Sequence, residues 1–311
     1  MLKRVVATAL FISGAACAQA CDGRLIDSDR VFASPVCIPT EPQRVVVMDH
    51  SFSLGIGLEL GLPIVGAPLT GMSDEVLKQA AIDAGVEDIG FIAEPSLEKL
   101  VALQPDLVIA FTSDAMLAQV YFPLLSTLAP TIVDKSGDWR GYYSLMGHLS
   151  GTEGLDEKVD SAFAEYTDRV ETMKTRMPQT TVSILRITTW DFQVYTDAPG
   201  AYAPFEVAAE VGLIRSAYET APAGPTLKRP DWEELEQLDG EVLLYIVGGT
   251  NDSDSNGRHE EVLANPLWRR LPSVEAGRAY RVDAGTWMEF SGLPSAHKVL
   301  DDIERYVIDA E

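Results

Sequence analysis

A run of apolar residues in the middle of the chain constrains the fold more than any other feature. Its members recur every three or four residues, at Leu155, Val159, Phe163, Tyr166, Val170, Met173 and Met177. That spacing is typical of one buried face of an α-helix. The run makes a helix of about 34 Å, since each helical residue adds roughly 1.5 Å. Gly154 precedes it and Pro178 follows it, so the sequence predicts one rigid rod between two halves of the molecule.

Strand and helix patterns alternate on both sides of this rod. A short β-branched run predicts a buried strand at 44–49. Further strands are predicted at 63–66, 106–111 and 131–134 before the rod, and at 181–187, 242–247 and 279–282 after it. Helical patterns occupy 51–60, 74–84, 96–105 and 116–128, and then 202–211, 232–238 and 295–308. Alternation of this kind indicates an α/β fold with mostly parallel sheets that helices cover on both faces.

One phrase occurs once in each half. SLEKLVALQPDLVIAF runs from Ser96 to Phe111, and DWEELEQLDGEVLLYI runs from Asp231 to Ile246. In both, a Glu is followed by Leu at +2 and +5, a helix breaker at +7, an acidic residue at +8 and an apolar run. Each copy predicts a helix followed by a strand, with a carboxylate near the helix start, where the helix dipole favours it. The two halves are therefore expected to be equivalent lobes.

The N-terminus has the three parts of a secretory signal peptide. Lys3 and Arg4 precede an apolar run of about a dozen residues, which is too short to span a bilayer as a helix. Ala18-Gln19-Ala20 then provides a small-x-small cleavage site. We expect residues 1–20 to be removed on export to the periplasm.

Cleavage after Ala20 leaves two of the three cysteines, Cys21 and Cys37. An even pair in an oxidising compartment predicts a disulfide. It would close a loop of roughly 17 residues and stabilise the fold by about 3 kcal/mol. Two alternatives stay open: lipoprotein processing at Cys17 or Cys21, which both lack the usual upstream Leu, and two free thiols.

The net charge of -23 excludes some partners. Nucleic acid and anionic membrane surfaces repel so acidic a chain, so neither is expected as the main partner. A cationic patch on a partner protein would be attracted.

Several stretches together resemble a known family. They are PQRVVVMD followed by a helix and GLPIVG, the first copy of the repeated phrase, APFEVAAEVGL, the second copy, and AHKVLDDIERYV. In this order they resemble the periplasmic substrate-binding proteins of ATP-driven importers for ferric siderophores, haem and cobalamin, from about Pro42 to the C-terminus. The segment from Cys21 to Val47 is similar to iron-siderophore members. The resemblance implies a class III periplasmic binding protein-like fold, with an N-terminal α/β lobe (21–153), a linking helix (154–177) and a C-terminal α/β lobe (178–311).

The resemblance also implies a function and a partner. A protein of this family holds an iron chelate between its lobes and delivers it to an ABC permease in the inner membrane, without chemistry of its own. One Glu on each lobe pairs with permease arginines, and by motif these are Glu98 and Glu233, with Glu234 as a rival. The alternative is that both carboxylates only favour their helix N-termini. Iron arrives inside its chelator, so no cofactor and no metal ligand on the chain are expected, and the protein is expected to be a monomer.

Ligands of open α/β sheets lie beyond the carboxyl ends of the strands. Aromatic rings and arginines at those places suit a bulky anionic ligand, because rings stack and guanidinium groups bind oxygen atoms. The candidates are His50, Trp139, Arg140, Tyr142, Tyr143, Arg186, Tyr202 and Trp287, with Thr112, Trp190, Tyr195, Gly248, Gly249 and Met288 beside them. The family tends to place a siderophore-contacting arginine at the position of Arg186. The tyrosines and His50 have packing or local hydrogen bonding as the alternative.

Other functions fit the sequence less well. A metal-ion carrier needs several converging ligands, whereas the four histidines are scattered at His50, His148, His259 and His297. GIGLELG is one residue too long for a dinucleotide loop, and the chain has no G-x-S-x-G motif, which argues against an enzyme. Haem or cobalamin as the ligand, a metal-ion carrier of the same architecture, and a periplasmic sensor remain alternatives.

Overall fold

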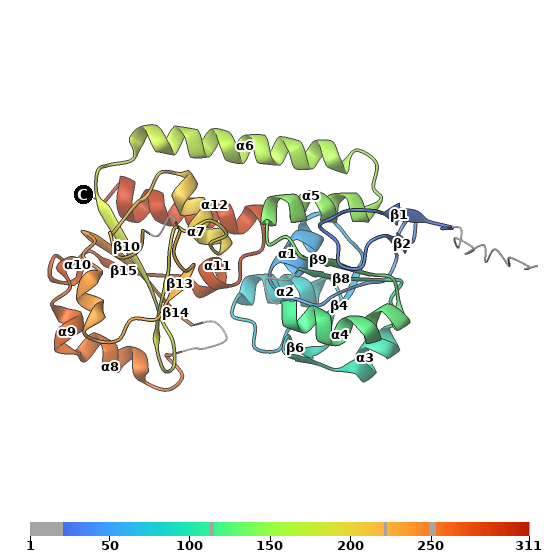
Figure 1. The fold of residues 1–311 in the computed structure, drawn as a ribbon, viewed down its shortest axis with the longest axis horizontal. Coiled ribbons are helices and arrows are strands. Elements are labelled where there is room, and N and C mark those ends of the chain that lie inside the picture. The colour runs from blue at the N-terminus through green and yellow to red at the C-terminus, as the bar shows by residue number, and fades with distance from the viewer. Residues whose placement is uncertain (1–20, 112–114, 221–222, 249–252, 311) are drawn as a thin grey trace, which may run out of the picture.

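The computed structural model describes residues 21–111, 115–220, 223–248 and 253–310, without the side chains of 115–119. Two α/β lobes lie side by side, and one long helix runs along the edge of both (Figure 1). The N-terminal lobe is built on a five-stranded sheet and the C-terminal lobe on a six-stranded sheet. The expected two-lobed architecture is confirmed. The signal peptide prediction lies outside the described residues.

The sheet of the N-terminal lobe is entirely parallel, with strand order β5-β4-β3-β8-β9. Its strands are β3 (Val45–Val47), β4 (Ile64–Ala67), β5 (Glu87–Asp88), β8 (Leu107–Phe111) and β9 (Thr131–Asp134). Its helices are α1 (Phe52–Glu59), α2 (Glu75–Asp83), α3 (Leu97–Leu103), α4 (Ala115–Leu128) and α5 (Trp139–Ser150). α1 and α5 share a core with one face of the sheet, and α3 and α4 with the other. The ribbon of β6 (Gly90–Phe91) and β7 (Glu94–Pro95) precedes α3.

The sheet of the C-terminal lobe is mixed, with strand order β13-β11-β10-β14-β15 and β12 also paired with β10. β11 is antiparallel to both of its neighbours, while β10, β12, β14 and β15 are parallel. The strands are β10 (Thr181–Ile187), β11 (Phe192–Tyr195), β12 (Ile214–Arg215), β13 (Leu227–Lys228), β14 (Val242–Val247) and β15 (Ala279–Val282).

Helices cover both faces of this second sheet. α7 (Ala203–Glu210), α11 (Ala284–Met288) and α12 (Leu293–Ile303) pack on the face toward the other lobe, and a π-helical turn, η2 (Glu304–Ile308), extends α12. The opposite face packs against a 3-10 turn, η1 (Glu234–Gln237), and against α8 (Arg258–Ala264), α9 (Pro266–Arg269) and α10 (Pro272–Glu275).

The long central helix is α6 (Leu155–Arg176), as its apolar spacing predicts. Five of the seven stripe residues are buried, and Phe163 and Met177 are half-buried. Their core does not stop at the boundary between the lobes. Residues of α1 and α5 from one lobe, of α6, and of α7 and α12 from the other belong to one continuous apolar cluster. The lobes therefore share a core beneath α6.

A short hairpin closes the N-terminal end. β1 (Arg24–Ile26) pairs antiparallel with β2 (Val36–Ile38), and Cys21 and Cys37 form a disulfide with Cα atoms 5.6 Å apart. The predicted disulfide is confirmed. Arg30 fixes the hairpin to the lobe, since its guanidinium lies 2.8 Å from the carboxylates of both Asp134 and Asp138.

Two segments differ in local structure from what the sequence predicted or left unassigned. The second copy of the repeated phrase does not form an α-helix but the single 3-10 turn η1. Asp231 and Glu234 bond each other's backbone N–H groups, at 2.9 and 3.2 Å, and this reciprocal cap starts a turn that ends at Leu238. The segment 139–150, for which the sequence pattern was assigned no element, is the helix α5. Asp138 caps it, accepting from the N–H groups of Arg140 and Gly141.

Candidate functional site

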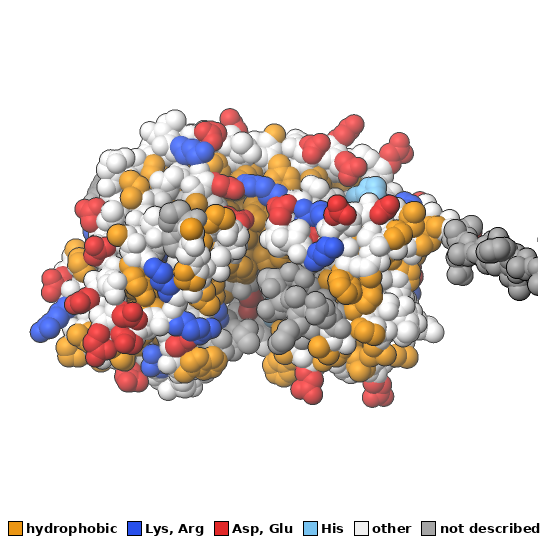
Figure 2. All heavy atoms as spheres, viewed as in Figure 1, with side chains coloured by type: hydrophobic (Ala, Val, Ile, Leu, Met, Phe, Trp, Pro, Cys, Tyr) orange, Lys and Arg blue, Asp and Glu red, His pale blue; other side chains and the backbone are white. Residues whose placement is uncertain are grey.

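A cavity of about 900 Å³ lies between the lobes. Its walls come from the ends of β3, β8 and β9 in the N-terminal lobe, and from β10, β11 and the start of α7 in the C-terminal lobe. Figure 2 shows the surface hollowed between the lobes, with hydrophobic side chains on the walls. The cavity therefore lies where the rule of strand carboxyl ends places a ligand.

Arg186 carries the most informative charge of this cavity. It belongs to the carboxyl half of β10, lines the cavity, and is only 9% exposed. Its two hydrogen bonds to described residues are long: Nη1 lies 3.5 Å from Oε1 of Gln193, and Nη2 lies 3.4 Å from the carbonyl oxygen of Gly248. The buried Nε has no hydrogen-bond partner among the residues that the structure describes. A buried guanidinium with weak contacts to neutral groups is costly unless an anion completes it, so this side chain is poised to bind one.

Lys135 supplies a second cation from the opposite lobe. It follows β9 directly, is exposed, and lines the same cavity. Its place immediately after a strand is the signal that the sequence analysis missed, because aromatic content drew attention to residues 139–143 instead. An acidic protein thus presents positive charge on both sides of its cleft, which favours an anionic ligand.

Aromatic rings form much of the remaining wall. Phe52 and Phe111 line it from the N-terminal lobe, with ring centroids 4.3 Å apart. Tyr195 and Tyr202 line it from the C-terminal lobe. The hydroxyl of Tyr202 donates to the carbonyl of Met288 at 3.0 Å and accepts from the N–H of Phe290 at 3.1 Å. Burial raises the pKa of Tyr202, so its neutral ring is what faces the cavity.

Asp49 lines the cavity but is committed to the scaffold. Its carboxylate accepts hydrogen bonds from the N–H of Ser53 at 2.7 Å and of Phe111 at 3.1 Å, and from the Ser53 hydroxyl. Desolvation raises the pKa of Asp49, and the hydrogen bonds from Ser53 and Phe111 oppose that rise. The group therefore joins β3, β8 and the start of α1.

His50 lies between this cavity and a smaller chamber of about 590 Å³. It is 6% exposed, and its buried Nδ1 has no hydrogen-bond partner in the described part of the chain. Nε2 lies 3.9 Å from Glu289 of the other lobe. Glu289 also accepts from the N–H groups of Ser73 and Asp74, at 2.8 to 2.9 Å, just before α2. His50 therefore sits beside a hydrogen-bonded contact between the lobes.

The structure does not bring Trp139, Tyr142 and Tyr143 to the cavity, which corrects their prediction as ligand contacts. All three are at most 2% exposed and lie on the buried face of α5. The ring of Trp139 packs 5.1 Å from Phe290 of the C-terminal lobe. The hydroxyl of Tyr142 lies 2.5 Å from that of Ser53. Their spacing of three and four residues, continued by Met146, was the missed sign of a helix.

Arg140 and Trp287 also lie away from the cavity. Arg140 forms a bidentate ion pair with Glu210 of α7, at 2.8 and 2.5 Å, and the hydroxyl of Tyr166 donates to the same carboxylate at 2.7 Å. This group, the Arg140 cluster, ties α5, α6 and α7 together. Trp287 is fully buried and donates to Asp302 at 2.8 Å. Both residues join helices to one another and do not line the cavity, which corrects their prediction as ligand contacts.

The remaining candidates fall into three groups. Tyr195 and Met288 line the larger cavity, and Gly248 lines the smaller chamber. Trp190 lines neither of these cavities and is exposed. Thr112 and Gly249 lie outside the described residues.

Glu98 and Glu233 are both exposed. Glu98 lies in the first turn of α3, and Glu233 directly precedes η1, which packs against α9. α3 and α9 both lie on the side of the molecule opposite α6 (Figure 1). The carboxylate of Glu234, the alternative candidate to Glu233, accepts a hydrogen bond from the N–H of Asp231 at 3.2 Å. The geometry therefore leaves Glu98 on one lobe and Glu233 on the other exposed, on elements at the same side of the molecule.

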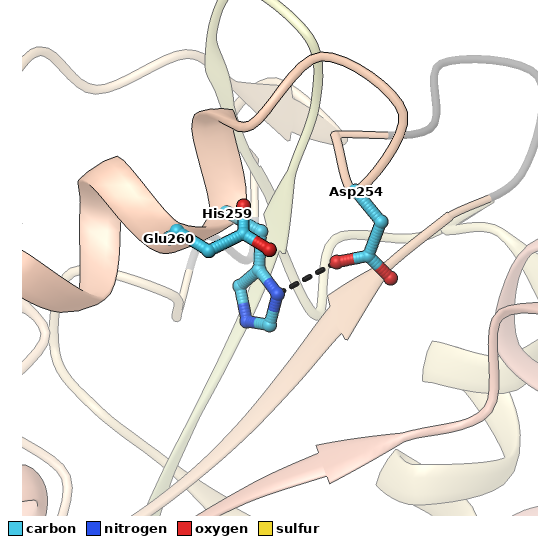
Figure 3. Close-up of side chains that lie close together, drawn as sticks. All are labelled: Asp254, His259 and Glu260. Carbon is cyan, nitrogen blue, oxygen red and sulfur yellow. Dashed lines mark hydrogen bonds and ion pairs between the residues drawn. The ribbon is translucent and has the colours of Figure 1, made fainter.

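One group of side chains has the composition of a metal site. Asp254, His259 and Glu260 place ligand atoms within 4.8 Å of one another (Figure 3). However, Nδ1 of His259 lies 2.7 Å from Asp254, and Arg281 lies 2.5 Å from the other oxygen of that carboxylate. A neighbouring guanidinium opposes cation binding, so the arrangement is best explained as an ion-pair network on the C-terminal lobe.

Among the helices of the described residues, none has the length and apolar content of a membrane span.

Comparison with known proteins agrees with this geometry. Residues 46–286 match the family model described as periplasmic binding protein. The probable siderophore-binding lipoprotein YfiY of Bacillus subtilis is 26% identical over 285 residues, which cover 87% of this chain and 84% of that protein. The achromobactin-binding periplasmic protein of Dickeya dadantii is 26% identical over 276 residues, which cover 85% and 86%. The crystal structure of Staphylococcus aureus SirA complexed with staphyloferrin B superposes with a TM-score of 0.73 at 18% identity, covering 89% of this chain and 97% of that one.

Proposed function

The chain belongs to the periplasmic binding protein family, and on that premise we propose that it captures an anionic ferric siderophore and delivers it to an ABC permease. Relatives over most of its length are described as siderophore- and achromobactin-binding proteins. The observation that carries the proposal is the buried, weakly satisfied guanidinium of Arg186 in a cavity between the lobes.

The shape and lining of the cavity support this cargo. Its volume of about 900 Å³ accommodates a metal chelate of drug-like size. Aromatic walls offer apolar and stacking contacts, while Arg186 and Lys135 offer positive charge from the two lobes. The chelator keeps the iron coordinated, so the protein needs neither a cofactor nor a metal ligand of its own, and no chemical step takes place on the chain.

Binding is tested with the purified mature protein. Tryptophan fluorescence quenching, repeated by calorimetry, is measured against ferric citrate, a ferric hydroxamate and a ferric catecholate, each with its iron-free chelator. Haem, cobalamin and zinc ions complete the panel. We expect sub-micromolar binding of at least one ferric chelate and weaker binding of its iron-free form. Binding of haem, cobalamin or zinc alone would favour the corresponding carrier, and no binding at all would favour a sensor.

Export and anchoring are tested on protein from the membrane and soluble fractions of its host. We propose that residues 1–20 are a signal peptide and that the mature chain starts at Cys21, disulfide-bonded to Cys37 and unlipidated. Intact mass spectrometry distinguishes the outcomes, because an acylated Cys21 adds the mass of its lipid and cannot form the disulfide.

We further propose that Glu98 and Glu233 dock on the permease, one from each lobe. Exposed carboxylates accept two hydrogen bonds from one guanidinium, so arginine is their natural partner. Changing both to Ala should abolish transport while the affinity for the chelate in solution stays the same. The control replaces Glu41 and Glu157, which are also exposed, and should transport normally. Loss of chelate affinity in the double variant would refute the docking role.

A further inference from the structure

In the described part of the chain, two large aromatic side chains are strongly exposed, one on each lobe. Phe91 is 57% exposed and Trp190 is 63% exposed. Aromatic side chains dominate the energetics of interfaces as well as of cores, because burying rings of this size is strongly favourable. Both rings belong to hairpins at the side of the molecule opposite α6 (Figure 1).

On the N-terminal lobe, the hairpin leads directly into the segment that carries Glu98. Phe91 of β6 pairs with Glu94 of β7, and the N–H of Ser96 donates to the carbonyl of Ile89 at 2.6 Å. Ser96 then caps α3, placing Glu98 in the first turn. The ring of Phe91 is seated against Gly71, where an added Cβ would lie 3.0 Å from it. It is therefore held in place although one side faces water.

On the C-terminal lobe, a turn holds Trp190 beside the segment that leads to Glu233. Thr188 closes the turn by donating its N–H to the carbonyl of Asp191 at 3.0 Å. Asp191 pairs with Arg229, and the ring of Phe192 packs 4.9 Å from Trp232, the residue before Glu233. Each exposed ring thus belongs to a hairpin that contacts the segment carrying Glu98 or Glu233.

Most charged side chains around the two rings are acidic, and the neighbouring Lys99 and Arg229 already form ion pairs. On the N-terminal lobe, Glu94 and Glu98 are exposed, while Lys99 lies 3.3 Å from Glu87 and donates to the carbonyl of Asp88. On the C-terminal lobe, Asp231, Glu233 and Glu234 are exposed, while Arg229 is held by Asp191. A partner surface that carries arginines complements both places, because guanidinium groups pair with carboxylates and stack on rings.

We propose that Phe91 and Trp190, each on a hairpin that contacts the segment of one docking glutamate, are apolar contacts for the arginine-bearing periplasmic surface of the permease. This inference rests on the proposed delivery of a chelate to a permease and adds a second pair of contacts to it. An anionic lipid surface and a second copy of this chain fit poorly, since the acidic residues around both rings repel them.

The test measures binding of chelate-loaded protein to the permease of the source organism in nanodiscs. Phe91→Ala and Trp190→Ala should each weaken binding about 5- to 10-fold, and the double variant more, while calorimetry shows chelate affinity within about twofold of wild type. Trp190→Phe should retain most of the binding. Leu25→Ala, which removes an exposed apolar side chain from β1, should bind normally.

The outcomes separate this inference from the docking role of the glutamates. If Glu98→Ala with Glu233→Ala abolishes binding while both aromatic variants bind like wild type, the inference fails and the docking role stands. If the glutamate variant also binds normally, the docking role fails as well. Equal binding to nanodiscs without permease assigns the rings to a lipid surface, and dimerisation lost in Trp190→Ala assigns them to a second copy. Weaker chelate binding in Phe91→Ala places that ring in the cargo site, since it lines the smaller chamber.

Discussion

The two lobes carry the same sequence phrase and build it differently. In the N-terminal lobe it forms the capped seven-residue helix α3 and the buried strand β8. In the C-terminal lobe it forms one 3-10 turn, η1, and the buried strand β14. Both versions nevertheless leave a glutamate exposed ahead of two inward leucines, which are buried or half-buried. The shared element is therefore the position of a carboxylate relative to a sheet, and the type of helix that presents it is free to vary.

The largest expected effect is a loss of stability in the N-terminal lobe when the disulfide is removed. Replacing Cys21 and Cys37 by Ser should lower the free energy of unfolding by about 3 kcal/mol, because the closed loop restricts the unfolded chain. Hydrogen exchange should rise around β1, β2 and the end of α5, where Arg24 donates to the carbonyls of His148 and Leu149. The C-terminal sheet should keep its protection. Equal loss of protection in both lobes would show that the lobes unfold as one unit.

The two cations of the cleft offer the next comparison. Arg186→Gln should weaken binding of the best ferric chelate by about 2 kcal/mol, or roughly 30-fold, since Arg186 is buried. Lys135→Gln should cost about 0.5 kcal/mol, because an exposed charge is screened by water. Calorimetry at two salt concentrations checks both values. Equal losses, or a larger loss at Lys135, would mean that the N-terminal lobe holds the charged part of the cargo.

The Arg140 cluster allows the junction between the lobes to be measured. A double-mutant cycle with Arg140→Ala and Glu210→Ala should give a coupling energy of about 1–2 kcal/mol, as expected for a half-buried bidentate pair. Tyr166→Phe removes one further hydrogen bond and should cost less. Urea unfolding provides the free energies. A coupling energy near zero would mean that the shared apolar core alone joins the lobes.

The smallest expected effect is a change in the stability of the fold with pH. Burial, with the charges of Glu210 and Asp138 nearby, raises the pKa of Glu206 to about 7, and Arg140 opposes that rise. A carboxyl whose pKa is higher in the folded state stabilises the fold below its unfolded pKa of about 4.5, and this contribution is lost as the pH rises through 7. Because Glu206 is partly exposed, the loss should be only about 1 kcal/mol. Glu206→Gln should therefore be more stable than wild type at pH 8 and similar at pH 5, and equal stability at both would contradict the shift.

Strong periodicity made much of the fold predictable. The seven-residue stripe of α6 and the β-branched runs of β9, β10, β14 and β15 gave the long helix and the strands with near-correct bounds. Short elements that depend on local hydrogen bonds were harder to predict from the sequence. η1 depends on the reciprocal cap between Asp231 and Glu234. α5 was not predicted as a helix, and its aromatic residues were predicted only as ligand contacts.

The site was predictable only in part. Arg186, Tyr195, Tyr202 and His50 follow or end strands and do line the cavity. Lys135 meets the same rule and was overlooked. Trp139, Arg140 and Trp287 have the right chemistry, but each is committed to partners far away in the sequence, namely Phe290, Glu210 and Asp302. Such long-range partners decide whether a ring or a guanidinium faces a cleft or a core, and a single sequence does not reveal them.

If the protein delivers its ligand to a permease as proposed, the apolar core that continues beneath α6 from one lobe into the other affects how that transporter recognises the loaded form. Lobes that share a dry, closely packed interior rotate little without opening voids, so loaded and empty forms should have nearly the same outline. A transporter that distinguishes them must then sense the cargo where it shows at the mouth of the cleft. The ATP-driven movement of the transporter would then have to separate the two lobes to release the cargo.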